Sequence, residues 1–311
     1  MSASRWRALA VAPAAALAGL LLAACTSGGP AAVAPSPDGS ASSAAPESSL
    51  GSAPGGSPGR PPAHVVVVVF ENKAQQQVLG SPDAPYLNAL SATGARFSRS
   101  RAVTHPSQPN YVALFSGSTQ GVTDDSCPQR LGDRPNLGQQ LVRAGHSFAG
   151  YSEGLPSAGF TGCSDASGRY ARKHNPWVDF ANVSASANLP LTAFPTDLSW
   201  HPTVSFVIPD LCHDMHDCDV ATGDRWARDH LAPYVAWARS HDSLLVVTFD
   251  EDDGSPSNRI LTFLVGPMVK AAVIPQPADH YSLLRTIEDL YRLEPLGAAR
   301  SATPLAGWRA G

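Results

Sequence analysis

Charge is scarce in this sequence, and no excess of positive charge is present. Only 15% of its 311 residues are charged, and the formal net charge at pH 7 is -4. Because a protein that binds nucleic acid through bulk charge needs a basic surface, this composition excludes that class of protein. Cysteine is sparse too, and no two of the five cysteines have the C-x2-C spacing typical of zinc sites. The 43% of apolar residues still predicts a folded, globular region.

The N-terminal residues have the pattern of an export signal. Arg5 and Arg7 precede an apolar run over 8–24, and Cys25 follows directly after Leu-Ala-Ala. The placement of Cys25 resembles a bacterial lipobox, in which this cysteine is lipidated and becomes the mature N-terminus. An ordinary signal peptide with a chance cysteine is the alternative. A transmembrane helix is disfavoured because the run is short and rich in alanine.

Residues 26–62 consist almost entirely of Ser, Pro, Gly and Ala and contain no aromatic residue. Such a segment cannot bury enough apolar surface to offset its ordering entropy, so we expect a disordered tether. The predicted organisation is therefore a signal peptide at 1–25, a tether at 26–62 and one catalytic domain at 63–311. Export places this domain outside the cytoplasmic membrane, either as a cell-membrane lipoprotein or as a secreted protein.

Four cysteines lie inside the expected domain, in a compartment that permits disulfides. Four cysteines allow three pairings. The short separation between Cys212 and Cys218 favours that pair, which leaves Cys127 with Cys163.

Apolar runs alternate with helical patterns along the domain. Buried strands are expected at 64–70, 203–208, 244–249 and 260–265, because strands covered on both faces have continuous apolar runs. Helices are expected at 84–93, 136–144, 224–239 and 282–293. The stretch 152–202 has little periodicity and predicts loops that cover the site. This order predicts an α/β fold, a three-layer sandwich with a central, mostly parallel mixed sheet.

Polar residues follow three of the predicted strands. Glu71 and Asn72 follow the first, the acidic run 250–253 follows the third, and the segment 210–217 follows the strand at 203–208. Because ligands of open α/β sheets bind beyond the carboxyl ends of the strands, these residues are candidates for one site. Carboxylate and amide oxygens suit a hard divalent cation, and imidazoles suit zinc, iron or a phosphate. Each segment alone is more often a turn, a helix cap or a solvated loop, and their coincidence favours the site.

Ser107 precedes Pro109 and an apolar, helix-like run. The simplest role for such a serine is to cap the helix. The alternative role is that of a nucleophile. A hydroxyl at a helix N-terminus facing a cation is easier to ionise, and it meets an incoming anion at the positive end of the helix dipole.

Five segments in order resemble the bacterial phosphoesterase family of acid phosphatases and phosphatidylcholine-type phospholipases C, within the alkaline-phosphatase-like superfamily. They are VVVVVFEN at 65–72, HPSQPNYVALFSG at 105–117, PDLCHDMHDCDVATGDRW at 209–226, TFDEDDG at 248–254 and HYSLLRTIEDLY at 280–291. The resemblance covers nearly all of 64–297 and is strongest to short secreted acid phosphatases of actinobacteria, some of which act on phosphoinositides. No long insertion or C-terminal extension of the kind found in the large phospholipases C is present, which favours the compact phosphatase branch.

The resemblance implies a role for individual side chains. A divalent metal ion of undetermined identity would be bound by Glu71, Asn72, Asp250 and Glu251. The catalytic residues would be Ser107, which becomes phosphorylated, and His213, His216 and His280. The phosphate would be bound by Asn72, Asn110 and His105. Asp214 and Asp224 would orient imidazoles from behind.

The expected protein is thus an exported, metal-dependent acid phosphatase that hydrolyses phosphomonoesters, phosphoinositides among them, through a phosphoserine intermediate. Its expected partners are a phosphomonoester, a lipid in some cases, and the membrane through an anchor at Cys25. A phospholipase C-type phosphodiesterase is the second enzyme hypothesis, since the same residues would serve it. A lipid-anchored lipoprotein that holds a metal or phosphate for a transporter is the non-enzyme alternative.

Overall fold

The computed structural model describes residues 60–310. The expected signal peptide at 1–25, with Cys25, and all but the last residues of the expected tether lie outside this range. Within residues 60–310, no helix is long and apolar enough to cross a membrane.

An eight-stranded mixed sheet forms the centre of the fold, with the strand order β4-β3-β5-β1-β6-β7-β2-β8. The strands are β1 (His64–Phe70), β2 (Ala95–Ser100), β3 (Phe148–Ser152), β4 (Asn188–Pro190), β5 (Val204–Ile208), β6 (Ser243–Phe249), β7 (Phe263–Val265) and β8 (Ala272–Ala278). Strand β7 runs antiparallel to β6 and β2, and the other neighbouring pairs are parallel. The prediction of a mostly parallel mixed sheet is confirmed.

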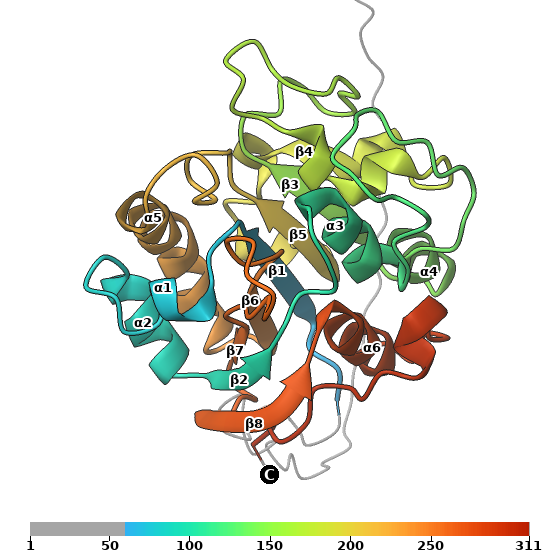
Figure 1. Ribbon diagram of the computed structural model, residues 1–311. Helices are drawn as coiled ribbons and strands as arrows, with labels where there is room; N and C mark the ends of the chain where they lie inside the picture. The colour runs from blue at the N-terminus through green and yellow to red at the C-terminus, as the bar shows by residue number, and fades with distance from the viewer. Residues whose placement is uncertain (1–59, 311) are drawn as a thin grey trace, which may run out of the picture. The chain divides into compact units, whose positions relative to one another are not determined.

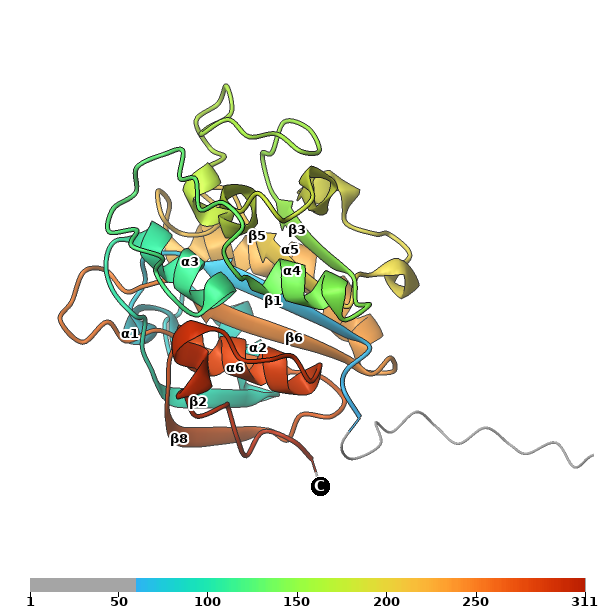
Figure 2. The ribbon, with the colours of Figure 1, turned by 90° about the vertical axis from the view of Figure 1, so that its right-hand side faces the viewer.

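Helices cover both faces of the sheet. They are α1 (Gln75–Val78), α2 (Pro85–Ala92), α3 (Ser107–Ser116), α4 (Leu137–Arg143), α5 (Val220–Ala238) and α6 (His280–Leu290). Short 3-10 helices are η1 (Arg172–His174), η2 (Pro176–Asp179), η3 (Ala185–Ala187), η4 (Leu191–Ala193), η5 (Leu198–Trp200) and η6 (Gly297–Arg300). Helices α3, α4 and α6 lie on one face, and α1, α2 and α5 lie on the other (Figures 1 and 2). The result is the expected three-layer sandwich.

The five consecutive valines of β1 explain why the strand reads as a continuous apolar run. Val65, Val67 and Val69 pack into the core beneath α3 and α6. Val66 and Val68 point the other way, into the core beneath α5. Since successive side chains of a strand alternate between faces, a strand with a core on each side has no polar position. Burying each such side chain contributes about 1.5–3 kcal/mol to stability.

Several elements differ from the sequence predictions. Helix α5 begins at Val220 rather than 224, because Asp219 caps it by accepting a hydrogen bond from the backbone N–H of Thr222. Helix α6 begins at His280 rather than 282, with Asp279 as its cap. The strand expected at 260–265 is limited to β7, and β2, β3, β4 and β8 were not predicted. Strand β8 contains Pro275 and Pro277, which are tolerated because β8 is an edge strand.

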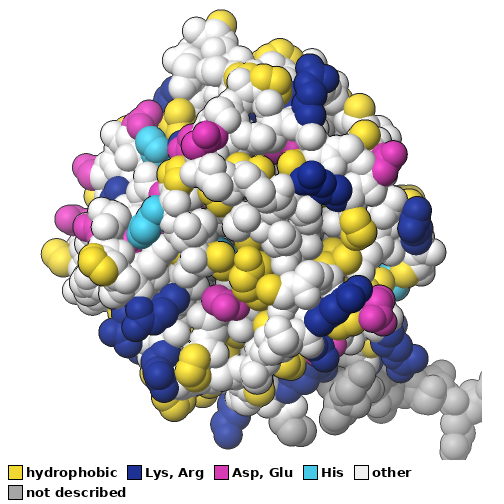
Figure 3. All heavy atoms as spheres, turned by 45° about the vertical axis from the view of Figure 1, so that its right-hand side comes forward, with side chains coloured by type: hydrophobic (Ala, Val, Ile, Leu, Met, Phe, Trp, Pro, Cys, Tyr) yellow, Lys and Arg dark blue, Asp and Glu magenta, His cyan; other side chains and the backbone are white. Residues whose placement is uncertain are grey.

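The surface carries charges of both signs. On the face in Figure 3, acidic and basic side chains are interspersed with apolar ones, and Lys and Arg occur singly or in small groups. This distribution agrees with the low and slightly negative net charge.

Candidate active site

The carboxyl ends of β1 and β6 bring the first two candidate ligands together. Phe70 and Phe249 are register partners in these parallel strands, so Glu71 and Asp250 leave the sheet at the same level. The backbone N–H of Asp250 donates to the carbonyl oxygen of Phe70 at 2.9 Å. Asn72 has a φ of 48°, in the left-handed region that Asn tolerates better than most residues, and its backbone N–H donates to Oδ1 of Asp250 at 3.2 Å. The chain therefore turns away from the sheet directly after Glu71.

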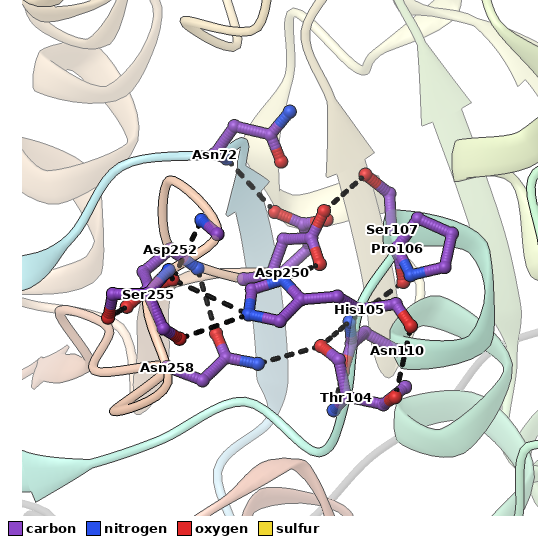
Figure 4. A network of polar contacts seen from close by, with 12 residues as sticks. Asn72, Thr104, His105, Pro106, Ser107, Asn110, Asp250, Asp252, Ser255 and Asn258 are labelled. Atoms are coloured by element: carbon purple, nitrogen blue, oxygen red, sulfur yellow. Dashed lines mark hydrogen bonds and ion pairs between the residues drawn. The ribbon is translucent and has the colours of Figure 1, made fainter.

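Ser107 begins helix α3, and its side chain is directed toward the acidic residues around Asp250 (Figure 4). Its Oγ donates to Oε2 of Glu71 at 3.0 Å and to Oε1 of Glu251 at 3.2 Å. All three side chains are buried, and Ser107 is only 1% exposed. The serine does not act as the helix cap, since Pro106 occupies that position without a side-chain hydrogen bond. The hydroxyl thus lies at the positive end of a ten-residue helix.

Four buried carboxylates share this site: Glu71, Asp214, Asp250 and Glu251. Burial raises the pKa of Glu71, Asp214 and Asp250 well above the usual range. The charge of Asp214 raises the pKa of Glu71 further, and the charge of Glu71 does the same to Asp250. Burial also raises the pKa of Glu251. Among residues 60–310, no Lys or Arg forms an ion pair with any of the four, so this density of acids requires protons or a bound cation.

The unsatisfied atoms of the site fit a divalent cation. Asn72 Oδ1, His174 Nε2, Asp214 Oδ2 and Asp250 Oδ2 are buried and have no hydrogen-bond partner. Buried polar atoms are nearly always paired, so four such atoms around one group of carboxylates need an explanation. Carboxylate oxygens, an amide oxygen and an imidazole nitrogen are a donor set that binds divalent metals. The side chains present therefore fit the metal site that the sequence predicts.

His174 is a site residue that the sequence analysis missed. It lies in η1, inside the stretch that was predicted only as loops, and its ring stacks on Tyr111 with the centroids 5.0 Å apart. Its Nε2 lies 3.1 Å from Oε1 of Glu71, and its Nδ1 lies 3.5 Å from Oδ2 of Asp214. These three side chains offer ligand atoms that all lie within 4.8 Å of one another. A single histidine in a segment without periodicity carries no spacing signal that would have revealed it.

Two of the predicted histidines border the carboxylates. His105 Nδ1 lies 2.5 Å from Oε2 of Glu251 (Figure 4), and its ring faces a cleft of about 500 Å³ that Asn72 also lines. The ring of His216 lies 6.2 Å from that of His174, and its Nδ1 lies 2.6 Å from Oδ1 of Asp217. Both side chains are partly exposed, at 36% and 28%, so both are accessible to a substrate.

The other two predicted histidines have different surroundings. His280 is buried at the start of α6, with Nε2 2.6 Å from the backbone oxygen of Asp250. Its ring therefore contacts the backbone of Asp250 and is buried, and the catalytic role expected for it stays a prediction. His213 pairs with other acids, because its Nδ1 lies 2.9 Å from Oε2 of Glu153 and 3.3 Å from Oδ1 of Asp210. It belongs to a second acid–histidine cluster at the end of β3.

Asn110 and Asp224 have structural roles instead of those expected. The Asn110 side chain accepts from the backbone N–H of Val103 and Thr104 and donates to the carbonyl oxygens of Thr104 and Pro106. Its amide is fully used in shaping the loop before Ser107, so it is not available to phosphate. Asp224, on α5, accepts from the backbone N–H of Tyr86 and Leu87 at the start of α2. It caps that helix and contacts no histidine of the site.

The structure contains the disulfides Cys127–Cys163 and Cys212–Cys218. The second closes a short loop that carries Asp214. The backbone oxygen of Asp214 accepts from the backbone N–H of Glu71 at 2.8 Å. This disulfide therefore fixes the loop against the end of β1.

A serine hydroxyl between buried carboxylates at the ends of parallel strands is the arrangement that the sequence motifs predict. A family model described as the Phosphoesterase family matches residues 81–294. The chain belongs to the Phosphoesterase family. This membership confirms the family resemblance of the five motifs.

Relatives within the family are phosphomonoester hydrolases. A phosphatidylinositol-3-phosphatase of Mycobacterium tuberculosis is 47% identical over 245 residues, which are 78% of this chain and 81% of that protein. A phosphate-repressible acid phosphatase of Penicillium chrysogenum is 31% identical over 227 residues, 68% of this chain, and the match spans only 55% of the fungal protein. The chain is therefore an enzyme of a phosphoesterase family whose similar members are named as phosphatases.

The fold of this Phosphoesterase family member is similar to that of solved structures, among them a protein of the alkaline phosphatase superfamily. A member of that superfamily from Vibrio parahaemolyticus superposes with a TM-score of 0.51, 13% identity and coverage of 80% of this chain and 71% of the other. Murine ectonucleotide pyrophosphatase/phosphodiesterase 5 superposes with a TM-score of 0.53 and 11% identity, over 75% of this chain and 96% of the other.

Proposed function

We propose that the protein is a metal-dependent acid phosphatase that hydrolyses phosphomonoesters through a phosphoserine intermediate. The observation that carries the proposal is the Ser107 hydroxyl, which lies at the N-terminus of α3 within hydrogen-bond distance of Glu71 and Glu251. The names of the relatives support phosphatase activity. The nucleophile and the metal are our own assignments.

Ser107 attacks the phosphorus atom of the substrate. Its Oγ forms a bond to phosphorus while the bond between phosphorus and the leaving oxygen breaks, and its proton passes to Glu251 or Glu71. The N-terminus of α3 provides backbone N–H groups and a positive dipole for the phosphate oxygens. Water then hydrolyses the phosphoserine and regenerates the hydroxyl.

The residues that would hold the metal are Glu71, Asn72, Asp250 and Glu251, with Asp214 and His174 beside them. A bound divalent cation would neutralise the carboxylates, polarise a phosphoryl oxygen and ease ionisation of the serine. The buried atoms that lack hydrogen-bond partners are the specific support for this assignment.

His216 and His105 are the histidines placed to donate a proton to the leaving oxygen. Both border the carboxylates and both are partly exposed. A histidine must be protonated to act as the general acid, so this role favours activity at acid to neutral pH.

Phosphoinositides are a proposed substrate class, supported by the relative from Mycobacterium tuberculosis. Export, cleavage of the signal peptide and a lipid anchor at Cys25 remain proposals from the sequence. A Cys25→Ser variant should be released to the medium or keep its signal peptide. Unchanged membrane retention of this variant would contradict the anchor.

The deciding experiment compares two ester types with and without metal. The full chain is stripped with a chelator and resupplied with Ca²⁺, Mg²⁺, Mn²⁺ or Zn²⁺. It is then assayed from pH 5 to 8 with p-nitrophenyl phosphate and with a phosphocholine diester. Turnover of the monoester that returns with one metal is the expected result. Turnover of the diester alone would move the protein to the phospholipase C activity, and no turnover by a folded protein would favour the binding lipoprotein.

A variant pair tests the metal ligands. Asp250→Asn should abolish both activity and the rise in Tm on adding the restoring metal. Asp219→Asn is the matched control, because Asp219 caps α5 and contacts none of the site carboxylates. A metal-dependent rise in Tm that persists in Asp250→Asn would remove Asp250 from the ligand set.

A further inference from the structure

An apolar cavity lies on the α5 side of the sheet. Its volume is about 340 Å³, and its floor is formed by Val66 of β1 and Val207 of β5. Leu231 and Tyr234 of α5 form one wall, and Leu191 and Phe194 in the segment around η4 form the opposite wall. The exposed residues Thr192 and His230 also line the cavity, so it opens to solvent between η4 and α5.

The lining gives this cavity a preference for hydrocarbon. Apolar walls offer water few hydrogen-bond partners, so an apolar ligand gains free energy by displacing water from them. A water molecule occupies about 30 Å³ in the liquid, so the space is far larger than a packing defect. Its lining by two sheet strands, a helix and a loop is mostly apolar, which suits an alkyl chain.

The polar part of the cavity lining is linked to the candidate site by the loop 210–217. Glu153 lines the cavity, and its Oε2 lies 2.9 Å from Nδ1 of His213. The next residue along the chain is Asp214, whose carboxylate lies 3.5 Å from His174 in the site. One loop therefore separates the apolar cavity from the carboxylates around Ser107. Carboxylates and an imidazole on that loop are groups that hydrogen-bond hydroxyls.

We propose that the cavity holds an alkyl chain of a lipid phosphomonoester whose phosphate is bound at Ser107. This inference rests on the proposed phosphatase function and specifies its substrate as an amphiphile. The phosphate would lie at the carboxylates, the hydroxylated part of the headgroup beside Glu153 and His213, and one chain between α5 and η4. Along this path the protein changes from charged to polar to apolar. The lipid changes in the same order from its phosphate through its hydroxylated headgroup to its alkyl chain.

The test fills the cavity and varies the chain length of the substrate. Leu191→Trp places an indole in the cavity, and Thr192→Trp obstructs its mouth from an exposed position. Val273→Trp adds the same ring at an exposed site on β8 that does not line the cavity and is the matched control. Each full-length variant is assayed with p-nitrophenyl phosphate, with soluble dibutanoyl phosphatidylinositol 3-phosphate and with the dipalmitoyl lipid in phosphatidylcholine vesicles.

Both cavity variants should lower kcat/KM for the dipalmitoyl lipid by about tenfold, which corresponds to the burial of about two methylene groups. They should leave kcat/KM for the two soluble substrates within about twofold of the wild type. Equal losses on all three substrates, or no loss on the long-chain lipid, would overturn the proposal. If the wild type hydrolyses none of the three substrates, the proposed phosphatase function fails instead.

A binding measurement separates the cavity from catalysis. Dansylundecanoic acid should bind the wild type with enhanced fluorescence, bind the Val273→Trp control equally, and bind Leu191→Trp at least tenfold more weakly. Dipalmitoyl phosphatidylinositol 3-phosphate should displace the probe. Probe binding that Leu191→Trp leaves unchanged would show that alkyl chains bind elsewhere, and probe binding that the lipid fails to displace would show another occupant. Either result would overturn the proposal.

Discussion

The Ser107 hydroxyl lies 3.0 Å from Oε2 of Glu71, although 36 residues separate the two in the chain. Glu71 stands at the carboxyl end of the central strand β1, and Ser107 begins the helix that packs on that strand. This contact joins the group proposed to attack the substrate to a group proposed to bind the metal. It makes the role of Ser107 open to a direct test.

Replacing Ser107 should separate catalysis from folding. Ser107→Ala should lower kcat for p-nitrophenyl phosphate by at least a thousandfold, because it removes the nucleophile. Ser116→Ala removes a buried hydroxyl from the other end of the same helix, where it donates to backbone carbonyl oxygens, and should keep its activity. Circular dichroism and Tm would verify that both variants fold. Turnover by a folded Ser107→Ala protein would end the nucleophile assignment.

One disulfide should contribute more to stability, and the other should contribute more to activity. In the chain-entropy model, the 36-residue separation of Cys127 and Cys163 gives about 4 kcal/mol, and the 6-residue separation of Cys212 and Cys218 gives about 2 kcal/mol. The shorter loop carries Asp214, whose backbone oxygen accepts from Glu71. A Cys212→Ser/Cys218→Ser protein should therefore lose less stability but more activity than a Cys127→Ser/Cys163→Ser protein. Urea unfolding measures the stability of both proteins, and phosphatase assays measure their activity. If the loop did not position the site, the Cys212→Ser/Cys218→Ser protein would keep at least as much activity as the other protein.

Asp224 should matter for stability alone. Its carboxylate accepts two backbone N–H groups at the start of α2. Asp224→Ala should lower the free energy of unfolding by about 1–3 kcal/mol, since these donors lose their partner. Its kcat at a temperature where the variant is folded should equal that of the wild type. A selective loss of kcat would instead restore the role in the site that the sequence analysis expected.

Glu288 should make stability depend on pH. Burial raises the pKa of this α6 side chain to about 8, while an unfolded glutamate titrates near 4.3. Between these values the folded protein holds a proton that the unfolded chain has lost, so the free energy of unfolding falls as pH rises. The contribution of Glu288 is fully present below pH 4.3 and is lost as pH rises through 8.

Glu288→Gln stays neutral and retains an oxygen for the backbone N–H of Leu296. Its Tm relative to the wild type should rise between pH 5 and pH 8, by a few degrees for each kcal/mol. The exposed Glu294→Gln is the control and should show no such trend. A difference in Tm that is constant with pH would show that Glu288 titrates normally.

The sequence predicts best those parts of the molecule that local patterns determine. The continuous valine run of β1 predicts a buried strand. Glu71 and Asn72 after that strand, and Asp250 after the strand at 244–249, were predicted to lie close together. Ser107 followed from its place before a helix. Strand β2, which contains Arg96 and Arg99, has no apolar pattern that predicts a strand. It is a strand because it pairs with β7 and β8, and such pairing cannot be read from its own sequence.

Roles that depend on tertiary contacts were not predictable. Asn110 and Asp224 have polar side chains of a kind found in phosphate and metal sites, but these side chains form hydrogen bonds with nearby backbone groups. His280 was expected to face the substrate, but its ring is buried against the backbone of Asp250. His174 enters the site from a segment without periodicity, so only the packed chain reveals it.

The direction of β1 separates the point where the described chain enters the fold from the candidate active site. The described chain enters the fold at Arg60, next to the amino end of this strand, and Glu71 leaves at the other end. Seven strand residues span about 23 Å. The catalytic opening therefore lies at the edge of the sheet opposite the point where the described chain enters, so the residues before Arg60 join the domain away from that opening.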